Sequence, residues 1–166
     1  MSMKRMTLGF ILVALATGVA AYGGYVFLFR DSAGLLNADN AQVTAKGKAI
    51  YAQQCASCHG QNLEGQPDWQ TRDEEGFLPA PPHDRNGHTW HHPDRLLFDI
   101  TKLGLARAAN LKDYRTRMPA FDGVLSDEEI IAALSYIKST WPVEFQKRHD
   151  ELNRVHERRK RLAPLR

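Results

Sequence analysis

The segment Cys55-Ala56-Ser57-Cys58-His59 is the most informative part of this 166-residue chain. Two cysteines separated by two residues and followed directly by a histidine form the attachment motif of a c-type haem. In such a site the two thiols add to the haem vinyl groups as thioethers, and the histidine supplies one axial nitrogen to the iron. We therefore expect one covalent haem c, held by Cys55 and Cys58, with His59 as the first iron ligand.

Two other uses of paired cysteines compete with this interpretation. A redox-active dithiol of the thioredoxin type needs a βαβ context, which the sequence does not show. A structural zinc site needs further cysteines or a second pair of ligands, whereas this chain has only Cys55 and Cys58. Because the expected haem uses both cysteines, no disulfide is predicted.

An uncharged segment of 22 residues, Leu8–Phe29, lies near the N-terminus. A helix of this length is about 33 Å long, enough for the ~30 Å hydrocarbon core of a bilayer. Lys4 and Arg5 precede it, so the positive-inside rule places the N-terminus in the cytoplasm and the rest of the chain outside. We predict a signal-anchor transmembrane helix within residues 1–30, in a bacterial inner membrane, with the haem domain in the periplasm.

Cleavage of this segment as a signal peptide is the alternative, and it would leave the protein soluble in the periplasm. Val19-Ala20-Ala21 would serve as the small-residue cleavage site. Cleavage there would expose the apolar segment 22–29 as a new N-terminus, and signal h-regions are shorter, about 7–15 residues. The uncleaved anchor is therefore the favoured interpretation.

The chain after the anchor divides into a linker over residues 31–43, a haem domain over 44–142 and a basic helical extension over 143–166. Apolar residues in the domain recur at helical spacing and no segment alternates as a strand would, so the expected fold class is all-α. A domain of about 100 residues has a thin core of its own, so the haem should supply the main core element.

Three helices are expected within the domain, and their ends carry recognisable signals. The segment Ser126-Asp127-Glu128-Glu129 is a capping box, Pro93 is a favoured first-turn residue, and Pro67–Pro82 is rich in loop-forming residues. The expected helices run from Gln42–Thr44 into Cys55–Cys58, from Pro93 to Gly104, and from Ser126 to Pro142.

The net charge of +3 comes from the C-terminal extension rather than from the haem domain. Residues 44–142 carry 11 basic and 13 acidic side chains, whereas residues 143–166 carry 8 basic and 4 acidic ones. Arg158-Arg159-Lys160-Arg161 concentrates this charge. We expect either a solvated helix or a docking site for anionic lipid headgroups or an acidic partner. No aromatic residues are interleaved with the basic ones, so nucleic-acid binding is not expected.

A wider pattern surrounds the attachment motif. Gly47 and Tyr51 precede Cys55 at intervals of four residues, and Tyr136 lies in the predicted last helix. From about Thr44 to Trp141 the chain resembles a class I cytochrome c. In that family the glycine lets the N- and C-terminal helices cross closely, and the aromatic residues pack at the crossing. The resemblance implies the class I cytochrome c fold around one haem, with Tyr51 packed on the haem side.

The resemblance also implies the second axial ligand and two further pocket residues. Met118 is the only methionine after the anchor and lies just before the last helix, where the family places its ligand. A thioether suits ferrous haem, and Met/His ligation raises the reduction potential. Pro81, with Pro79 as a substitute, aligns with the proline loop whose carbonyl accepts a hydrogen bond from the axial histidine. Trp90 resembles a tryptophan of the family that lies near the haem propionates, and the alternative, which can coexist with this role, is an aromatic wall of the pocket.

Four histidines within ten residues offer alternatives. One of them could replace the methionine as the sixth ligand, which would lower the potential. Together they could bind copper or zinc, but no helical ligand spacing supports such a site. We expect loop histidines that are solvated or hydrogen-bonded to the propionates. They are His83, His88, His91 and His92.

These features predict an electron carrier and not an enzyme, because an iron with two protein ligands leaves no position open for a small-molecule substrate. We expect outer-sphere transfer of single electrons between membrane respiratory complexes, at the family level from a quinol-oxidising complex to a terminal oxidase. The alternative is a fixed haem c subunit of a larger membrane oxidoreductase, which the long charged tail favours. Further rivals are an enzyme or gas sensor with a displaced methionine, and a metal-handling protein that uses the histidines of residues 83–92.

Overall fold

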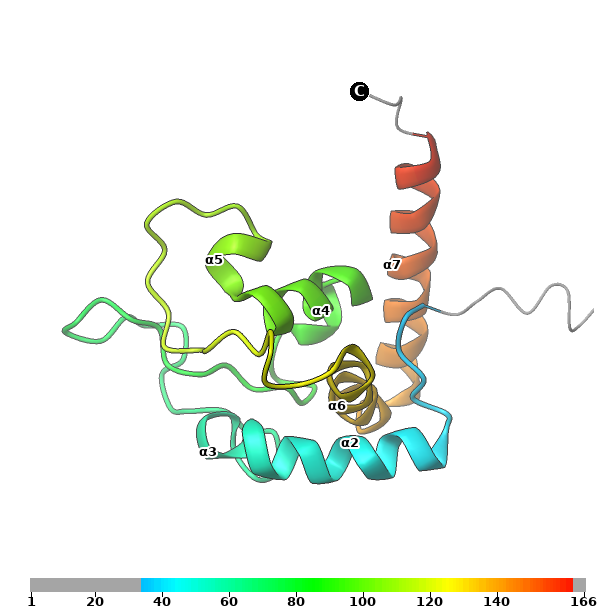
Figure 1. The fold of residues 1–166 in the computed structure, drawn as a ribbon, viewed down its shortest axis with the longest axis horizontal. Helices are drawn as coiled ribbons and strands as arrows, with labels where there is room; N and C mark the ends of the chain where they lie inside the picture. The colour runs from blue at the N-terminus through cyan, green and yellow to red at the C-terminus, as the bar shows by residue number, and fades with distance from the viewer. Residues whose placement is uncertain (1–33, 163–166) are drawn as a thin grey trace, which may run out of the picture. The chain divides into compact units, whose positions relative to one another are not determined.

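The computed structural model describes residues 34–162, which form helices joined by long loops (Figure 1). This range contains no strand, so the all-α prediction is confirmed. A membrane-spanning helix is not found among the described residues, since none of their helices is sufficiently long and apolar. The predicted span Leu8–Phe29 lies outside the described range.

Helix α2 (Ala41–Gln54) and the short helix α3 (Ala56–His59) carry the attachment motif. The side-chain oxygen of Asn40 caps α2 by accepting hydrogen bonds from two backbone N–H groups of its first turn. The sequence predicted one helix running into the motif. The structure instead interrupts it at Cys55, where φ is −120° and ψ is −36°.

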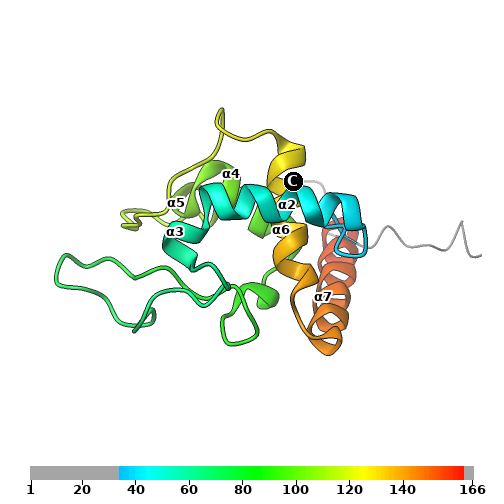
Figure 2. The same ribbon diagram turned by 90° about the horizontal axis from the view of Figure 1, so that it is seen from below.

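Helix α2 crosses helix α6 (Asp127–Ser139) beside Gly47, as Figure 2 shows. A Cβ atom on Gly47 would lie 1.9 Å from the carbonyl oxygen of Ala132, so no side chain fits at this point. One turn later Tyr51 packs against Tyr136, with ring centroids 5.6 Å apart. The close crossing expected from the glycine is therefore present.

The capping box of α6 forms as predicted. The Ser126 side chain accepts a hydrogen bond from the Glu129 backbone N–H, and the Glu129 side chain accepts one from the Ser126 N–H. Ile130, Leu134 and Ile137 are buried on one face of the helix. The helix ends at Ser139, somewhat earlier than the proline at position 142 that was expected to close it.

Helix α4 (Asp94–Leu103) ends at Gly104, which adopts a φ of 83° that favours glycine. Pro93 precedes the helix instead of forming its first residue. The short helix α5 (Leu105–Ala108) follows. Before α4, the chain from residue 60 to residue 88 is loop, as predicted for 67–82, and leads to the 3-10 turn η1 (Thr89–His91).

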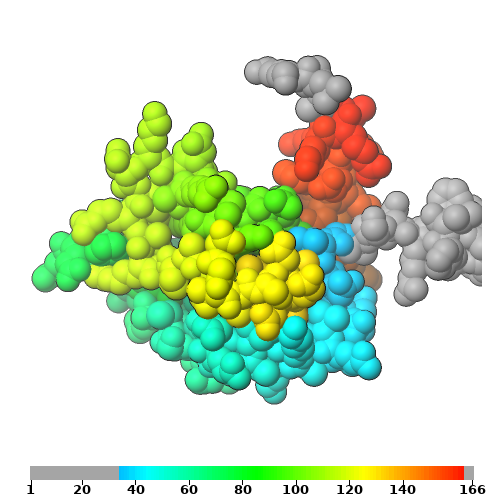
Figure 3. Space-filling model, in the orientation of Figure 1, coloured from blue at the N-terminus to red at the C-terminus, as the bar shows by residue number. Residues whose placement is uncertain are grey.

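Helix α7 (Val143–Leu162) follows the haem domain, and its two halves differ. The first half packs on the domain, where His149 and Asn153 are buried. Residues 156–162 are exposed, and they stand clear of the rest of the described surface (Figure 3). The predicted extension is therefore helical, with one buried face in its first part and exposed residues throughout 156–162.

The apolar core lies between α2, α4 and α6, and it includes a residue from the stretch expected to be a linker. Leu36 is buried, and its backbone N–H donates a hydrogen bond to Oδ2 of Asp94, 3.0 Å away. The next N–H, that of Asn37, donates to Oγ of Ser135 at 2.9 Å. The chain is therefore attached to the domain before α2 begins.

Candidate haem site

Cys55 lies at the junction of α2 and α3, and Cys58 lies within α3. Cys55 is half-buried and Cys58 is exposed. Burial, with a smaller contribution from Cys58, raises the pKa of the Cys55 thiol to about 11. A redox-active Cys-x-x-Cys pair requires the opposite, a thiol with a lowered pKa. The environment of Cys55 therefore disfavours the dithiol alternative.

His59 ends helix α3 and is buried. Its Nδ1 atom lies 2.8 Å from the carbonyl oxygen of Pro81, which can only accept a hydrogen bond. Donation from Nδ1–H leaves the lone pair on Nε2, the form in which an imidazole binds iron. Burial lowers the pKa of His59, and the hydrogen bond to Pro81 opposes this effect in part. The ring is thus neutral and oriented for ligation.

Local hydrogen bonds hold His59 and Pro81 in position relative to each other. The Tyr51 hydroxyl donates a hydrogen bond to the Gly60 carbonyl at 2.9 Å and so fixes the end of α3. On the other side, the Gln66 backbone N–H donates to the Ala80 carbonyl at 2.8 Å, and its side-chain oxygen accepts from the Ala80 N–H at the same distance. The proline carbonyl is therefore presented by a closed loop.

Trp90 provides a test of whether the site suits a haem. Its Nε1 atom is buried and has no hydrogen-bond partner among the described residues. Leaving a buried donor unpaired costs roughly 1–3 kcal/mol. A haem propionate would supply the carboxylate oxygen that this N–H lacks. The residues present therefore fit the group, and a place for Trp90 beside a propionate stays a prediction.

Met118 lies in the loop between α5 and α6, where the sequence placed the second ligand. Its side chain is half-buried and packs against the core cluster on which Cys55 and Trp90 also pack. Beyond it, Phe121 is buried, and its backbone N–H donates to the Thr101 carbonyl at 3.1 Å. The loop is thus fixed to α4 on the C-terminal side of Met118.

His83, one of the alternative ligands, lies beside His59. The two rings are stacked with centroids 4.1 Å apart. Nδ1 of His83 is 2.8 Å from the Thr89 hydroxyl, and the His83 carbonyl accepts a hydrogen bond from Trp141 Nε1 at 2.7 Å. Burial holds the pKa of His83 well below 6.5. A ligand opposite His59 would need to approach from the other side, so this stacking argues against His83 as the sixth ligand.

The other histidines of the cluster are engaged with aromatic neighbours. His88 stacks on Trp69 at 5.2 Å and meets His92 edge-on at 5.2 Å. His91 lies against Trp90 at 3.6 Å. Within residues 34–162, no three side chains of His, Cys, Asp or Glu are grouped so that they could hold a metal ion.

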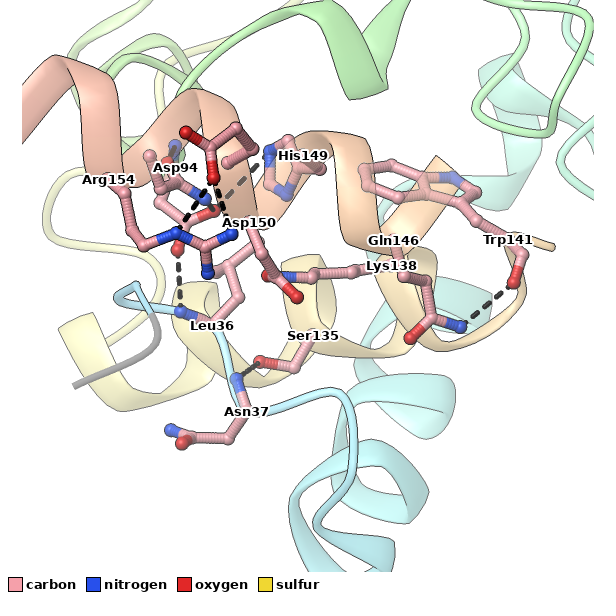
Figure 4. A network of polar contacts seen from close by, with 12 residues as sticks. Leu36, Asn37, Asp94, Ser135, Lys138, Trp141, Gln146, His149, Asp150 and Arg154 are labelled. Atoms are coloured by element: carbon pink, nitrogen blue, oxygen red, sulfur yellow. Dashed lines mark hydrogen bonds and ion pairs between the residues drawn. The ribbon is translucent and has the colours of Figure 1, made fainter. Parts of the chain in front are cut away.

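The contribution of α7 to the site was not predicted from the sequence. Phe145 packs edge-on against Trp90 at 4.6 Å. One turn later, Nε2 of His149 lies 2.8 Å from the His92 carbonyl, and Asn153 exchanges hydrogen bonds with Asp94. Figure 4 shows His149 beside Asp94. The sequence signal was the four-residue spacing of positions 145, 149 and 153, which was weak because two of these residues are polar.

Comparison with known proteins agrees with this geometry. The model of the family described as Cytochrome c matches residues 44–141, which is more than half of the chain. A curated relative, "Cbb3-type cytochrome c oxidase subunit FixP" of Bradyrhizobium diazoefficiens, is 27% identical over 112 residues, or 66% of this chain. The aligned part covers 34% of that relative, so this chain matches about a third of its length. No solved structure matches the chain.

The family match covers the attachment motif, the α2–α6 crossing and the loop of Met118. Its limits agree with the range that resembles a class I cytochrome c in sequence. The chain therefore belongs to the cytochrome c family, as a class I c-type cytochrome whose Cys-x-x-Cys-His motif binds haem c covalently.

Proposed function

We propose that this chain carries single electrons through a haem c whose iron is ligated by His59 and Met118. When bound, haem c supplies a one-electron iron couple. The observation that carries the proposal is the 2.8 Å contact between His59 Nδ1 and the Pro81 carbonyl, which keeps Nε2 free for iron. With the Met118 thioether as the second ligand, the protein would supply both iron ligands, so the site would suit electron transfer and not substrate turnover.

The chain's own residues set the surroundings of the site. Trp90 would offer its buried N–H to a propionate, and Phe145 packs edge-on against the indole. Cys55 and Cys58 fix the group to α3 through thioethers. Burial and hydrogen bonding of this kind tune the reduction potential of a haem.

We propose further that Leu8–Phe29 anchors the protein in a bacterial inner membrane, with the haem domain on the periplasmic face. The uncharged length of this segment and the preceding basic residues support the anchor. Signal cleavage, giving a soluble periplasmic protein, is the alternative. The N-terminus of the protein purified from membranes, identified by mass spectrometry, would decide between the two. An intact N-terminus demonstrates the anchor, and a mature N-terminus near Tyr22 demonstrates cleavage.

A terminal oxidase is the proposed electron acceptor, with a quinol-oxidising complex as donor. The support is that the curated relative is named as a subunit of a cbb3-type cytochrome c oxidase. The test is quinol-driven oxygen uptake by membranes that contain the full-length chain. We expect oxygen uptake to be lost when the chain is deleted. The wild-type chain should restore it, and a Met118→Ala variant should not. Undiminished uptake after deletion would contradict the assignment.

The relative's name also favours a second candidate, a fixed haem c subunit of an oxidase complex. A shuttle and a subunit differ in how firmly they associate with a complex. We would solubilise membranes in mild detergent and follow haem c through purification at low and high salt. Co-purification that resists high salt supports the fixed subunit, whereas release of the free protein supports the shuttle.

The basic end of α7 is the proposed contact with an acidic patch of the partner. Residues 156–162 are exposed, so four basic side chains face solvent there. Replacing all four by glutamine removes this charge without disturbing the docked half of α7. Weaker association at low salt is expected. Equal weakening by four matched exposed substitutions elsewhere would contradict the assignment, and loss of binding to anionic vesicles would redirect it to lipid. The tested residues are Arg158, Arg159, Lys160 and Arg161, and the controls are Lys48, Arg85, Arg107 and Lys112.

A further inference from the structure

The loop that carries Met118 is held unevenly on its two sides. After Met118, backbone hydrogen bonds join Phe121 and Asp122 to α4, at 3.1 and 2.9 Å. Before it, residues 115–117 make no backbone-to-backbone hydrogen bond with the part of the chain that the structure describes. The N-terminal side of this loop must therefore be fixed by side chains.

Those side chains are two arginines that reach one turn of the preceding long loop. Arg117 pairs with the carboxylates of Asp73 and, at 2.8 Å, Glu75. Arg115 donates a hydrogen bond to the Glu75 carbonyl at 2.6 Å. The guanidinium groups of Arg115 and Arg117 also lie over the Phe77 ring, 4.4 and 4.1 Å from its centroid. We call residues 66–80 the acidic strap.

The acidic strap is built to hold these groups in place. Oδ1 of Asp73 accepts hydrogen bonds from the backbone N–H groups of Glu75 and Phe77, at 3.0 and 2.9 Å, which leaves Oδ2 for Arg117. Arg117 lowers the pKa of Asp73, and the two backbone donors act in the same direction. The strap ends at Ala80, next to Pro81. The same loop thus reaches the residue that orients His59 and the residue that precedes Met118.

We propose that Asp73 and Glu75 are positioning residues that, through Arg117, hold Met118 in place as the iron ligand. This inference rests on the proposed ligation by Met118. The loop that carries Met118 would exchange between a closed form, in which the thioether binds the iron, and an open form, in which Met118 has dissociated from the iron. Ion pairs that exist only in the closed loop shift this equilibrium toward it.

Imidazole binding to the ferric full-length protein measures that equilibrium. Imidazole reaches the iron only when Met118 has left, so its apparent affinity scales with the fraction of open loop. In Asp73→Asn, the amide oxygen can still accept the two backbone hydrogen bonds while the charge opposite Arg117 is lost. Because these ion pairs are largely exposed, we expect imidazole to bind about two- to fivefold more tightly.

Glu74→Gln is the matched control, because Glu74 lies between the two carboxylates, is exposed, and forms no ion pair with the described residues. Its imidazole affinity should equal that of the wild type. In an Arg117→Gln background, Asp73→Asn should have no further effect. If Asp73→Asn fails to fold, salt replaces the substitution: imidazole binding to the wild type should tighten as the ion pairs are screened.

The failure of this inference and the failure of the proposed ligation give different results. If the wild type shows the far-red charge-transfer band of methionine-ligated ferric haem but Asp73→Asn binds imidazole like Glu74→Gln, the positioning role is wrong and the ligation stands. If the wild type lacks that band and Met118→Ala leaves imidazole binding unchanged, Met118 is not the ligand and both are wrong.

Discussion

Nε2 of His149 lies 2.8 Å from the carbonyl oxygen of His92 and ties helix α7 to the loop that carries Trp90. Asp94 is close to the same nitrogen, with its Oδ1 3.4 Å away. Nδ1 of His149 is buried without a hydrogen-bond partner among the described residues. A proton on Nδ1 would therefore be a buried donor without an acceptor, so the neutral ring suits this position.

Stability should fall in mild acid because of His149. Burial lowers its pKa, an effect that Lys138 reinforces and that Asp94, the His92 carbonyl and Asp150 oppose. A histidine with a lowered folded-state pKa stabilises the fold fully above its unfolded pKa of about 6.5 and loses this contribution as pH falls. The free energy of unfolding should thus decrease below about pH 6.5, by up to ~1.4 kcal/mol per pH unit for this one proton.

Denaturant titrations of holoprotein between pH 5 and 8 would test this. In His149→Gln the free energy of unfolding should decrease less steeply with falling pH than in the wild type. Part of the decrease should remain, because burial also lowers the pKa values of His83 and His92. His156→Gln is the control, because His156 is exposed on the same helix. An unchanged slope in His149→Gln would show that this ring does not govern the pH dependence.

Asn153 should be important for stability although it is polar and lies in the C-terminal extension. Its Oδ1 accepts a hydrogen bond from the Asp94 backbone N–H at 2.8 Å, and its Nδ2 donates to Asp94 Oδ1 at 2.9 Å. Asn153→Ala leaves a buried donor and a buried carboxylate oxygen short of partners, so a loss of about 1–3 kcal/mol is expected. Glu157→Ala, at an exposed site of α7, should change stability by less than about 0.5 kcal/mol. Equal effects of the two would contradict the docked arrangement of α7.

Trp90→Phe should change how the reduction potential depends on pH. A donor to an ionised propionate lowers the pKa of that propionate, so removing the indole N–H raises it. Deprotonation places negative charge near the iron and lowers the potential. The fall of potential with increasing pH should therefore begin at a higher pH in Trp90→Phe, as measured by redox titration across pH. Superimposable curves for the two proteins would mean that Trp90 is only a wall of the pocket.

Gly47→Ala should destabilise the α2–α6 crossing. The added Cβ atom would lie 1.9 Å from the Ala132 carbonyl oxygen, which belongs to the backbone and cannot rotate away. Overpacking of this kind costs about 1–3 kcal/mol or more. Lys48→Ala, at the exposed neighbouring position, is the control. Guanidinium unfolding monitored by helix content should shift to lower denaturant only in Gly47→Ala, and a matching shift in both would contradict the close approach.

Local signals predicted the helices and the attachment motif well. The capping box at Ser126 and the end of α4 at Gly104 depend on residues within a few positions, which a sequence displays directly. The sequence also allowed the hydrogen bond to the Pro81 carbonyl to be predicted, because prolines mark a loop and the resemblance implied the role of its carbonyl. These features lie within single segments or follow from the spacing pattern that carries the resemblance.

The contacts that sequence reasoning missed join distant segments through polar groups. Asp94 meets Asn153 59 positions later, and Asp73 meets Arg117 44 positions later. A polar side chain is buried only when a partner meets it, and periodicity gives no information about partners. Helix α7 is mostly charged, so its docked half resembled a solvated helix. Leu36 was likewise placed in a linker because Gly34, Asn37, Asp39 and Asn40 make the segment around it polar and loop-like.

The ligation of the iron by His59 and Met118 is the central claim, and near-infrared magnetic circular dichroism of the full-length ferric protein tests it most directly. The expected spectrum has the low-spin charge-transfer band of histidine–methionine ligation. A Met118→His variant should move this band to the position typical of two histidines. A bis-histidine or high-spin band in the wild type would contradict the claim.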